Sequence, residues 1–355
     1  MDLVKRTLAL VEISSVTGDE AAVCDYLAAQ LQRCLAQHEL IRIEHNLILR
    51  PKQRNHARLV ALVGHLDTVP PTAQNTPRIE GDRLYGLGAS DMKGGVALMW
   101  QLLAEPLSAP AFDVAYIFYS GEEGNYDDSG LIPVFAKLDW LKSIDLAVCL
   151  EPSDNVLQLG CMGTLHARLT VTGRAAHSAR PWQGENAIYR ALPLLETLAQ
   201  RPVLDQQLSA GPHSLTYREV MVATLAGGGS ARNVVPDSFW INLNYRFGPQ
   251  RSLADAEAQV RELVAERAAI AFVDRSPSGP IPVDNAVLDT LIDRCQLSVA
   301  PKQAWTDVAR FAEQGIDAVN WGPGQAAQAH QPDEYASVAH LHAGERLFRT
   351  FLSRE

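Results

Sequence analysis

The stretch Leu59–Pro70 reads LVALVGHLDTVP and changes from apolar to polar within a few residues. Its first six residues carry no polar side chain, which is typical of a strand buried on both faces of a sheet. His65 and Asp67 follow where that strand should end. On an extended path both side chains project to the same side, so Asp67 can hold one nitrogen of the His65 ring while the other faces outward. A metal-ligating histidine needs this arrangement, although a lone His-x-Asp also fits a polar loop.

Acidic residues follow two further predicted strands. The segment Phe112–Ser120 ends in Gly121-Glu122-Glu123-Gly124, and Asp145–Leu150 ends in Glu151-Pro152. A single glutamate after a strand is ordinary. Because the carboxyl ends of strands in an open α/β sheet form the crevice where ligands bind, the repeated pattern predicts a site there.

Two more candidates come from loops. Asp91 lies in the glycine-rich stretch YGLGASDMKGG (residues 85–95), just before a predicted helix at Val96–Leu103. An aspartate there could simply be a helix N-cap. His330 follows a predicted strand at Ala318–Trp321 and a Gly-Pro-Gly turn, so it too should lie past the carboxyl end of a strand.

Length and composition restrict the class of protein. The chain has 355 residues, which favours two domains, and its net charge of −10 argues against nucleic acid and anionic membranes as partners. Its five cysteines form no Cys-x-x-Cys pair, which indicates a reducing compartment. Charged residues interrupt the N-terminal apolar run and no apolar run reaches the length of a membrane span, so we expect a cytoplasmic protein without membrane contact.

The element pattern predicts an α/β domain with a central, mostly parallel sheet and an inserted α+β domain. We expect helices at residues 3–13 and from a Thr17–Glu20 capping box to about Gln37, and a strand at 41–49. From residue 164 the order β-α-β-β-α-β indicates a ferredoxin-like insertion. The predicted domains are 1–163 (catalytic, first part), 164–276 (inserted) and 277–355 (catalytic, second part).

The candidate side chains suit a pair of divalent ions. Two imidazoles with three carboxylates favour zinc, with cobalt or manganese as alternatives. Asp91 is the natural bridging ligand, because it is short and held in glycine-rich backbone. Adjacent glutamates point to different sides of an extended chain, so Glu123 can bind metal while Glu122 acts as general base in amide hydrolysis. The predicted metal ligands are His65, Asp91, Glu123, Glu151 and His330; Asp67 and Glu122 are predicted catalytic residues.

In order and spacing, these motifs resemble the dinuclear zinc hydrolases that include succinyl-diaminopimelate desuccinylases, acetylornithine deacetylases, aminoacylases and carboxypeptidase G. The stretches GCMGT (160–164), AHSAR (176–180), NVVP (233–236) and WTDVARF (305–311) are most similar to the actinobacterial-type desuccinylases. The resemblance implies a zinc-peptidase-like catalytic domain. It also implies one zinc on His65, Asp91 and Glu151, and the other on Asp91, Glu123 and His330.

The resemblance further implies that the inserted domain forms a homodimer and that His177 is catalytic, stabilising the oxyanion of an active site. It implies a small N-acyl amino acid substrate, with N-succinyl-LL-2,6-diaminopimelate first, in lysine and diaminopimelate biosynthesis. The family's arginine before the glycine at 163 is missing here, since Cys161-Met162 offers no cation; Arg180, Arg232, Arg246 and Arg310 are possible replacements. The implied substrate-binding residues are Asn233, Arg246, Thr306, Arg310, Gly322 and Gly324.

Three alternatives stay open at this point. Within the same chemistry, the substrate could be N-acetylornithine or a related acyl-amino acid, or a dipeptide. In another class, the chain could be a catalytically silent homologue that binds a ligand, but such proteins tend to lose the base or a metal ligand, and all are present here.

Overall fold

The computed structural model describes residues 1–73 and 75–354, which form two compact units. The first unit contains Met1–Gly160, Ile281–Ala300 and the described residues from Arg310 onward, and the second contains Cys161–Pro280 and Pro301–Ala309. The short segment Pro301–Ala309 thus belongs to the second unit. The predicted domain boundaries at residues 164 and 276 stay a prediction.

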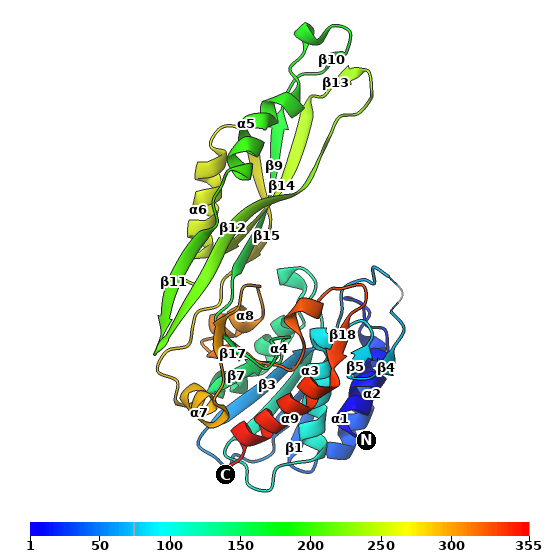
Figure 1. The fold of residues 1–355 in the computed structure, drawn as a ribbon, viewed down its shortest axis with the longest axis vertical. Coiled ribbons are helices and arrows are strands. Elements are labelled where there is room, and N and C mark those ends of the chain that lie inside the picture. Colours follow the sequence, from blue (N-terminus) through cyan, green and yellow to red (C-terminus); the bar gives the residue numbers. More distant parts are fainter. Residues whose placement is uncertain (74, 355) are drawn as a thin grey trace. The chain divides into compact units, whose positions relative to one another are not determined.

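The first unit is built on an eight-stranded mixed sheet (Figure 1). Its four central strands run parallel to one another, and antiparallel strands flank them. The predicted α/β class with a largely parallel centre is confirmed. In spatial order the strands are β1 (His38–Ile43), β2 (Asn46–Pro51), β6 (Asp113–Tyr119), β3 (Leu59–His65), β7 (Leu146–Cys149), β17 (Ala318–Asn320), β8 (Leu157–Leu159) and β16 (Val299–Pro301).

Strand β3 is the centre of this sheet, and all seven of its residues are buried. It lies between β6 and β7, with His65 opposite Tyr119 and Val63 opposite Cys149. Parallel pairing in this register makes the three strands end at the same edge. The polar segments that follow β3, β6 and β7 therefore leave the sheet side by side.

Helices α1, α3, α9 and α7 pack next to one another along the sheet (Figure 1). The ring of Trp321, which follows β17, stacks on Phe348 of α9 with centroids 3.9 Å apart. Phe135 of α4 meets Phe311 of α8 edge to face. The helix bounds are α1 (Leu3–Val11), α2 (Ala21–Leu31), α3 (Gly94–Ala104), α4 (Leu131–Lys137), α7 (Ala286–Cys295), α8 (Val308–Glu313) and α9 (Val338–Leu352).

Two local predictions in this unit are wrong. The predicted strand at 41–49 is a hairpin, in which β1 and β2 turn at Glu44, a residue with φ of 54°. The predicted helix from 17 to 37 begins at Ala21 and ends at Leu31 without a capping box. Its Thr17 hydroxyl instead donates to Asp67 over 2.9 Å, and the Glu20 carboxylate accepts from the N–H of Gly18.

Three short strands form a separate sheet in the order β18, β5, β4, with antiparallel pairing throughout. Their bounds are β18 (Tyr335–Ser337), β5 (Arg83–Tyr85) and β4 (Arg78–Glu80). This sheet joins the segment after His330 to the segment before Asp91, which are far apart in the sequence.

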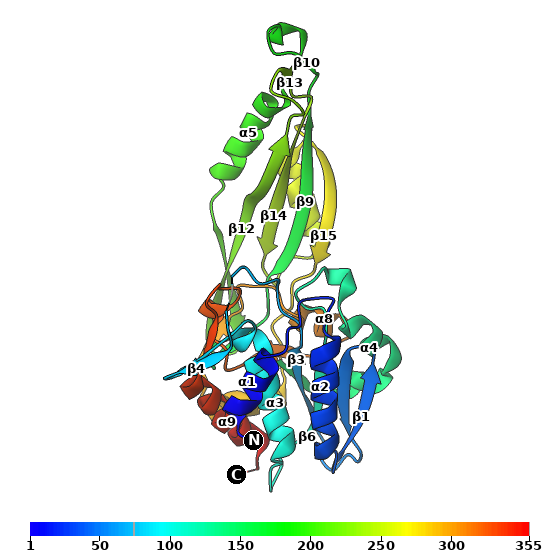
Figure 2. The same cartoon turned by 90° about the vertical axis from the view of Figure 1, so that its right-hand side faces the viewer.

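The second unit is an antiparallel sheet with two helices, and the predicted ferredoxin-like order is confirmed in its strands β12, β14, β9 and β15 (Figure 2). The sequence did not predict β11, which pairs with part of β12. Apolar side chains of α5, α6 and the sheet form one core. The bounds are β9 (Gly163–Thr172), β10 (Ala176–His177), α5 (Ala187–Ala199), β11 (Leu204–Ala210), β12 (His213–Gly228), β13 (Val234–Val235), β14 (Ser238–Phe247), α6 (Leu253–Val264) and β15 (Ala269–Ser276).

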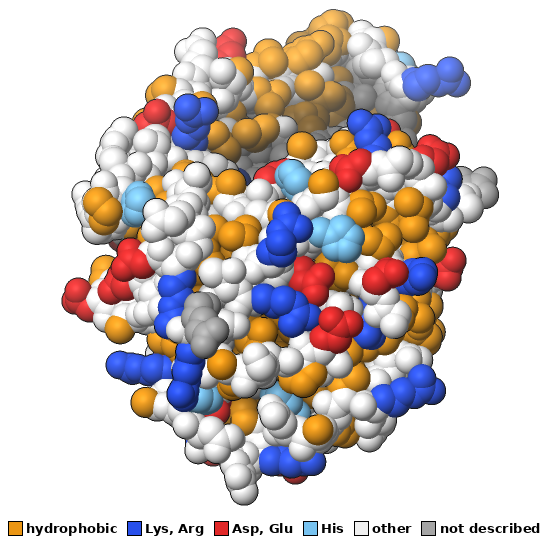
Figure 3. Space-filling model, turned by 60° about the horizontal axis from the view of Figure 1, so that its bottom comes forward, with side chains coloured by type: hydrophobic (Ala, Val, Ile, Leu, Met, Phe, Trp, Pro, Cys, Tyr) orange, Lys and Arg blue, Asp and Glu red, His pale blue; other side chains and the backbone are white. Residues whose placement is uncertain are grey.

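The surface carries charges of both signs. Acidic and basic side chains are interspersed over the face drawn in Figure 3. Among the described residues, no helix combines the length and the apolar character that crossing a bilayer requires.

Candidate metal centre

His65 is the last residue of β3, and its side chain is 1% exposed. Its Nδ1 lies 3.0 Å from the main-chain oxygen of Asp67 and 3.4 Å from Oδ1 of the same residue. Its Nε2 lies 3.2 Å from Oδ1 of Asp91. As the spacing predicts, Asp67 holds one ring nitrogen and leaves the other for a ligand position.

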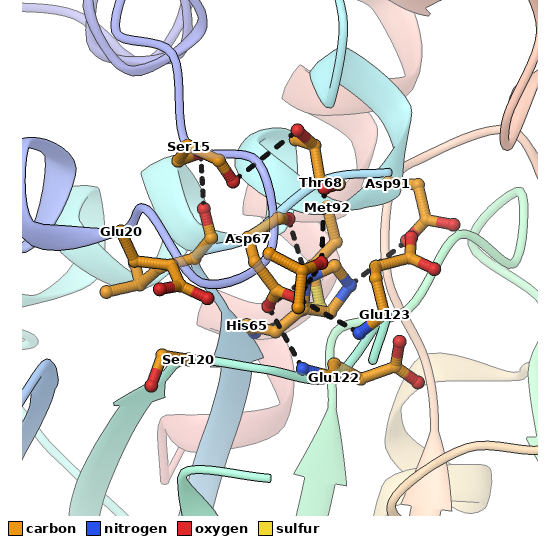
Figure 4. A network of polar contacts seen from close by, with 12 residues as sticks. Ser15, Glu20, His65, Asp67, Thr68, Asp91, Met92, Ser120, Glu122 and Glu123 are labelled. Carbon is orange, nitrogen blue, oxygen red and sulfur yellow. Dashed lines mark hydrogen bonds and ion pairs between the residues drawn. The ribbon is translucent and has the colours of Figure 1, made fainter. Parts of the chain in front are cut away.

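Asp67 also holds the two glutamates that follow β6 (Figure 4). Its Oδ1 accepts the main-chain N–H of Glu122 over 3.1 Å, and its Oδ2 accepts that of Glu123 over 3.0 Å. Burial alone would raise the pKa of Asp67, but its contacts with His65 and these two N–H groups outweigh that effect and lower the pKa. Asp67 is therefore an ionised carboxylate that fixes both the imidazole and the Glu122–Glu123 main chain.

Asp91 faces two imidazoles at once. Its Oδ1 lies 3.2 Å from Nε2 of His65, and its Oδ2 lies 3.7 Å from Nε2 of His330. The residue lies in a distorted helical turn, Ala89–Lys93, with φ −117° and ψ 93°, and the peptide bond that follows it is cis. One carboxylate with an oxygen toward each of two histidines has the form of a bridging ligand.

Glu123 and His330 complete the second side of this arrangement. Nε2 of His330 lies 2.9 Å from Oε1 of Glu123. The hydrogen bond with Glu123 raises the pKa of His330 to about 9, although partial burial opposes the shift. Burial likewise opposes protonation of His65, yet its carboxylate partners raise its pKa well above the usual value. Carboxylates thus make this a site that attracts positive charge.

The candidate side chains form three overlapping groups. Within each group, the possible ligand atoms all lie within 4.8 Å of one another. The groups are His65 with Asp91 and Glu151, His65 with Glu122 and Glu123, and Asp91 with Glu123 and His330. All five predicted metal ligands appear in these groups. Their roles as ligands stay a prediction.

Gly322 and Gly324 pack against the main chain that carries two of these ligands. A Cβ on Gly322 would lie 2.5 Å from the main-chain oxygen of Glu151, and one on Gly324 would lie 2.1 Å from that of Ser90. Glycine at these two positions allows the turn to approach both segments. The structure gives them a packing role, and contact with a substrate stays a prediction.

Arg310, another predicted substrate residue, contacts the loop that follows the glutamates. Its guanidinium donates to the main-chain oxygen of Tyr126 over 2.7 Å and lies 4.0 Å from the centre of the Tyr126 ring. The side chain is 4% exposed. These contacts give Arg310 a role in holding the 124–128 loop.

The remaining predicted residues belong to the second unit. His177 and Asn233 are exposed and lie close together, because β10 pairs with β13 and the N–H of Ser178 donates to the main-chain oxygen of Asn233. Arg246 lies on β14, where burial lowers its pKa, and Thr306 is buried. Their roles toward a substrate stay predictions.

Sequence reasoning missed Glu334, which is 1% exposed. It accepts hydrogen bonds from the main-chain N–H groups of Gly88, Ser90 and Asp91. Burial raises the pKa of Glu334 to about 7, although those three donors oppose the rise. Its position four residues after His330 was the one available signal.

Known proteins resemble this chain along its length. A Mycobacterium tuberculosis protein, provisionally named succinyl-diaminopimelate desuccinylase DapE, is 37% identical over 353 residues, which are 99% of this chain and 98% of the relative. The succinyl-diaminopimelate desuccinylase of Corynebacterium glutamicum is 33% identical over 99% of this chain and 96% of the relative. A tripeptidase structure from Staphylococcus aureus superposes with a TM-score of 0.81 at 19% identity, covering 99% of this chain and 96% of that chain, and shows a shared fold.

The model of peptidase family M20/M25/M40 matches residues 61–354, a range that begins inside β3 and ends after α9. The match covers every predicted metal ligand, the whole of the second unit, and the first unit from residue 61 onward. Together with the desuccinylase-named relatives, it confirms the predicted resemblance and the predicted class of metal-dependent hydrolase. This protein belongs to peptidase family M20/M25/M40.

Proposed function

We propose that this protein removes the succinyl group from N-succinyl-LL-2,6-diaminopimelate by metal-dependent hydrolysis of the amide, giving succinate and LL-2,6-diaminopimelate. One observation carries the hydrolytic part of the proposal: the two oxygens of Asp91 face His65 and His330, 3.2 and 3.7 Å away. The substrate part is supported by the names of the relatives, which are 33–37% identical to this chain.

The donor set fits two divalent cations, and zinc is the ion that we propose. Imidazole nitrogens with carboxylate oxygens are ligands that zinc prefers, and the contacts of Asp91 with His65 and His330 support a bridging role. One ion would be held by His65, Asp91 and Glu151, and the other by Asp91, Glu123 and His330. When bound, such ions polarise a carbonyl group and lower the pKa of water.

Glu122 is the general base in this proposal. It is half-buried, and its main chain is fixed by Oδ1 of Asp67. Its carboxylate lies in the group with His65 and Glu123, whereas the carboxylate of Glu123 also reaches His330. Glu122 can therefore take the proton of the attacking water and return it to the departing nitrogen.

Recognition of the succinyl carboxylate needs a cation, and Cys161-Met162 supplies none. Arg310 is largely buried and bonded to Tyr126. We therefore favour Arg180, Arg232 or Arg246 of the second unit for this contact. Asn233, Thr306, Gly322 and Gly324 remain the other proposed substrate-binding residues, and His177 the proposed oxyanion-stabilising residue.

The test is hydrolysis by zinc-loaded protein of N-succinyl-LL-2,6-diaminopimelate, N-acetylornithine and a dipeptide in parallel. We expect turnover of the succinyl substrate with a kcat/KM well above that of the other two. Turnover of acetylornithine alone would move the protein to the deacetylases. No turnover of any substrate by protein that carries two ions would favour a catalytically silent, ligand-binding homologue.

We further propose that the protein forms a homodimer through the second unit. In the described chain, β11 pairs with β12 only from His213 to Glu219, and Val220–Gly228 has β14 as its one paired neighbour. Leu225 and Val222 on this open edge are 63% and 48% exposed. Unpaired strand edges with apolar side chains favour pairing with another chain.

We also propose a cytoplasmic location. All five cysteines are free, and none is placed in a disulfide. A reducing compartment keeps thiols in this state.

A further inference from the structure

The carboxylate of Glu334 is held against the loop that carries Asp91. Its Oε2 accepts the N–H of Gly88 over 2.7 Å, and its Oε1 accepts those of Ser90 and Asp91 over 2.8 and 3.0 Å. Three main-chain donors converge on one buried carboxyl group, and when that group is ionised these hydrogen bonds are stronger than those between neutral groups. Glu334 is therefore the acceptor for nearly the whole turn that leads into Asp91.

The same segment holds this loop through further contacts. The main-chain oxygen of Glu334 accepts from Gly86 over 3.0 Å, and that of Tyr335 accepts from the Ser90 hydroxyl over 2.7 Å. His330 lies four residues before Glu334. The segment that supplies one proposed metal ligand thus also fixes the main chain of another.

A bridging carboxylate needs such support. Asp91 would serve two cations if one of its oxygens faced each, and its oxygens lie 3.2 Å from His65 and 3.7 Å from His330. The main-chain angles of Asp91 are not helical, so its N–H has no carbonyl acceptor of a regular helix. It donates to Glu334 instead. Without Glu334, three buried N–H groups would lose their acceptor, which favours a change in the loop.

We propose that Glu334 is a positioning residue for the metal centre, and that it sets the affinity for the ions that Asp91 would hold. The inference rests on the proposed function in one respect, because it assumes that the centre binds metal. Glu334 itself is in none of the candidate metal groups found among the described residues. It acts on the centre through the main chain of Asp91.

The chain offers a matched control in Glu219. This carboxylate is 2% exposed, lies in the second unit, and accepts the main-chain N–H of Gly248 over 2.9 Å. It also pairs with Arg251 at 3.1 Å. Glu219→Gln therefore disturbs a buried carboxylate with a main-chain donor, as Glu334→Gln does, but not at the Asp91 loop.

The experiment uses four proteins: wild type, Glu334→Gln, Glu334→Asp and Glu219→Gln. For each we would measure zinc and cobalt binding by titration, the visible spectrum of the cobalt form, and the unfolding midpoint without metal. We expect Glu334→Gln to bind zinc and cobalt roughly 10–100-fold more weakly with an altered cobalt spectrum, as for residues that orient ligands. Glu334→Asp keeps an acceptor on a shorter side chain, so its affinity should fall between those of wild type and Glu334→Gln. Glu219→Gln should bind both ions like wild type.

Two results would overturn the inference. One is wild-type affinity for both ions in the Glu334 variants; the other is an equal loss of metal binding in Glu219→Gln, which would show a general effect of destabilisation. If Glu334→Gln does not fold, Glu334→Asp decides the question by the same criteria. Because binding is measured without substrate, a wild type that binds two ions but hydrolyses no succinyl substrate refutes the proposed activity alone.

Discussion

The main-chain N–H of Glu123 donates to Oδ2 of Asp67 over 3.0 Å. Oδ1 of the same carboxylate accepts from Glu122 and lies 3.4 Å from the His65 ring. One ionised group therefore fixes a proposed ligand of each metal position and the proposed base. This explains why His65 and Asp67 are separated by one residue: the strand end places both on the side from which the Glu122–Glu123 loop approaches.

Asp67→Asn tests this arrangement. The two oxygens of Asp67 accept the main-chain N–H groups of Glu122 and Glu123, and asparagine would replace one of these oxygens with an NH₂ group, which cannot accept. Because one of the two hydrogen bonds would be lost, we expect activity and zinc affinity to fall about 10–100-fold. The control is Asp113→Asn, because Asp113 is also buried and accepts main-chain N–H groups, from Asn55 and His56, away from the centre. Equal losses in kcat/KM in the two variants would show that any buried aspartate has this effect.

Glu122→Gln should retain the metals and lose most turnover. A glutamine cannot accept the proton of water, and general base catalysis typically contributes about 10²–10⁴-fold. The measurement is kcat beside zinc content, with the exposed Glu39→Gln on β1 as the control. Undiminished kcat in a variant with full zinc content would remove Glu122 from the mechanism.

Removal of metal should abolish activity and lower the unfolding midpoint. Five carboxylates and two imidazoles converge at the centre, and a ligand that binds the folded state alone stabilises it by about 2.7 kcal/mol at 100 times its Kd. Dialysis against a chelator, followed by calorimetry and an activity assay, measures both effects. Zinc or cobalt should restore them, and magnesium should not. A chelated protein with unchanged midpoint and turnover would contradict a metal-dependent centre.

Some elements of the structure depend on the sequence of their own segment, and others depend on residues far away in the chain. The buried strand Leu59–His65 and the helix Gly94–Ala104, predicted at Val96–Leu103, follow from patterns within each segment. The capping box at Thr17 fails because its hydroxyl bonds to Asp67, 50 residues away. Glu334 could not be predicted for the same reason, since its partner Gly88 is 246 residues away. His65, Glu123 and Glu151 could be predicted because each lies at or just after the end of a strand, whereas the groups that orient the proposed ligands depend on tertiary contacts.

Gly324→Ala should weaken metal binding through crowding. The new Cβ would lie 2.1 Å from the main-chain oxygen of Ser90, the residue before Asp91, and 3.1 Å from Pro152 beyond Glu151. We expect a loss of about 1–3 kcal/mol in the free energy of unfolding, which is typical of overpacking, together with weaker zinc binding. The control is Gly315→Ala, where φ is +73° and no atom lies within 4 Å of the new Cβ.

The control should also lose stability, by about 1–2 kcal/mol, because alanine at positive φ is strained. Its zinc affinity should match that of wild type. The two variants thus have similar stability costs and different effects at the centre. Wild-type zinc affinity in Gly324→Ala would show that the close approach to Ser90 does not position Asp91.

Leu225→Lys should convert the proposed dimer into a monomer. Leu225 is 63% exposed on the part of β12 that β11 leaves uncovered, so a lysine there would bring charge into a strand pairing and remove apolar contact. The control is Val273→Lys on β15, because Val273 is 61% exposed on the opposite edge of the same sheet. Light scattering after size-exclusion chromatography should give twice the chain mass for wild type and the control, and the chain mass for Leu225→Lys. A dimer lost only in Val273→Lys would place the contact at β15. A monomeric wild type would refute the proposed dimer.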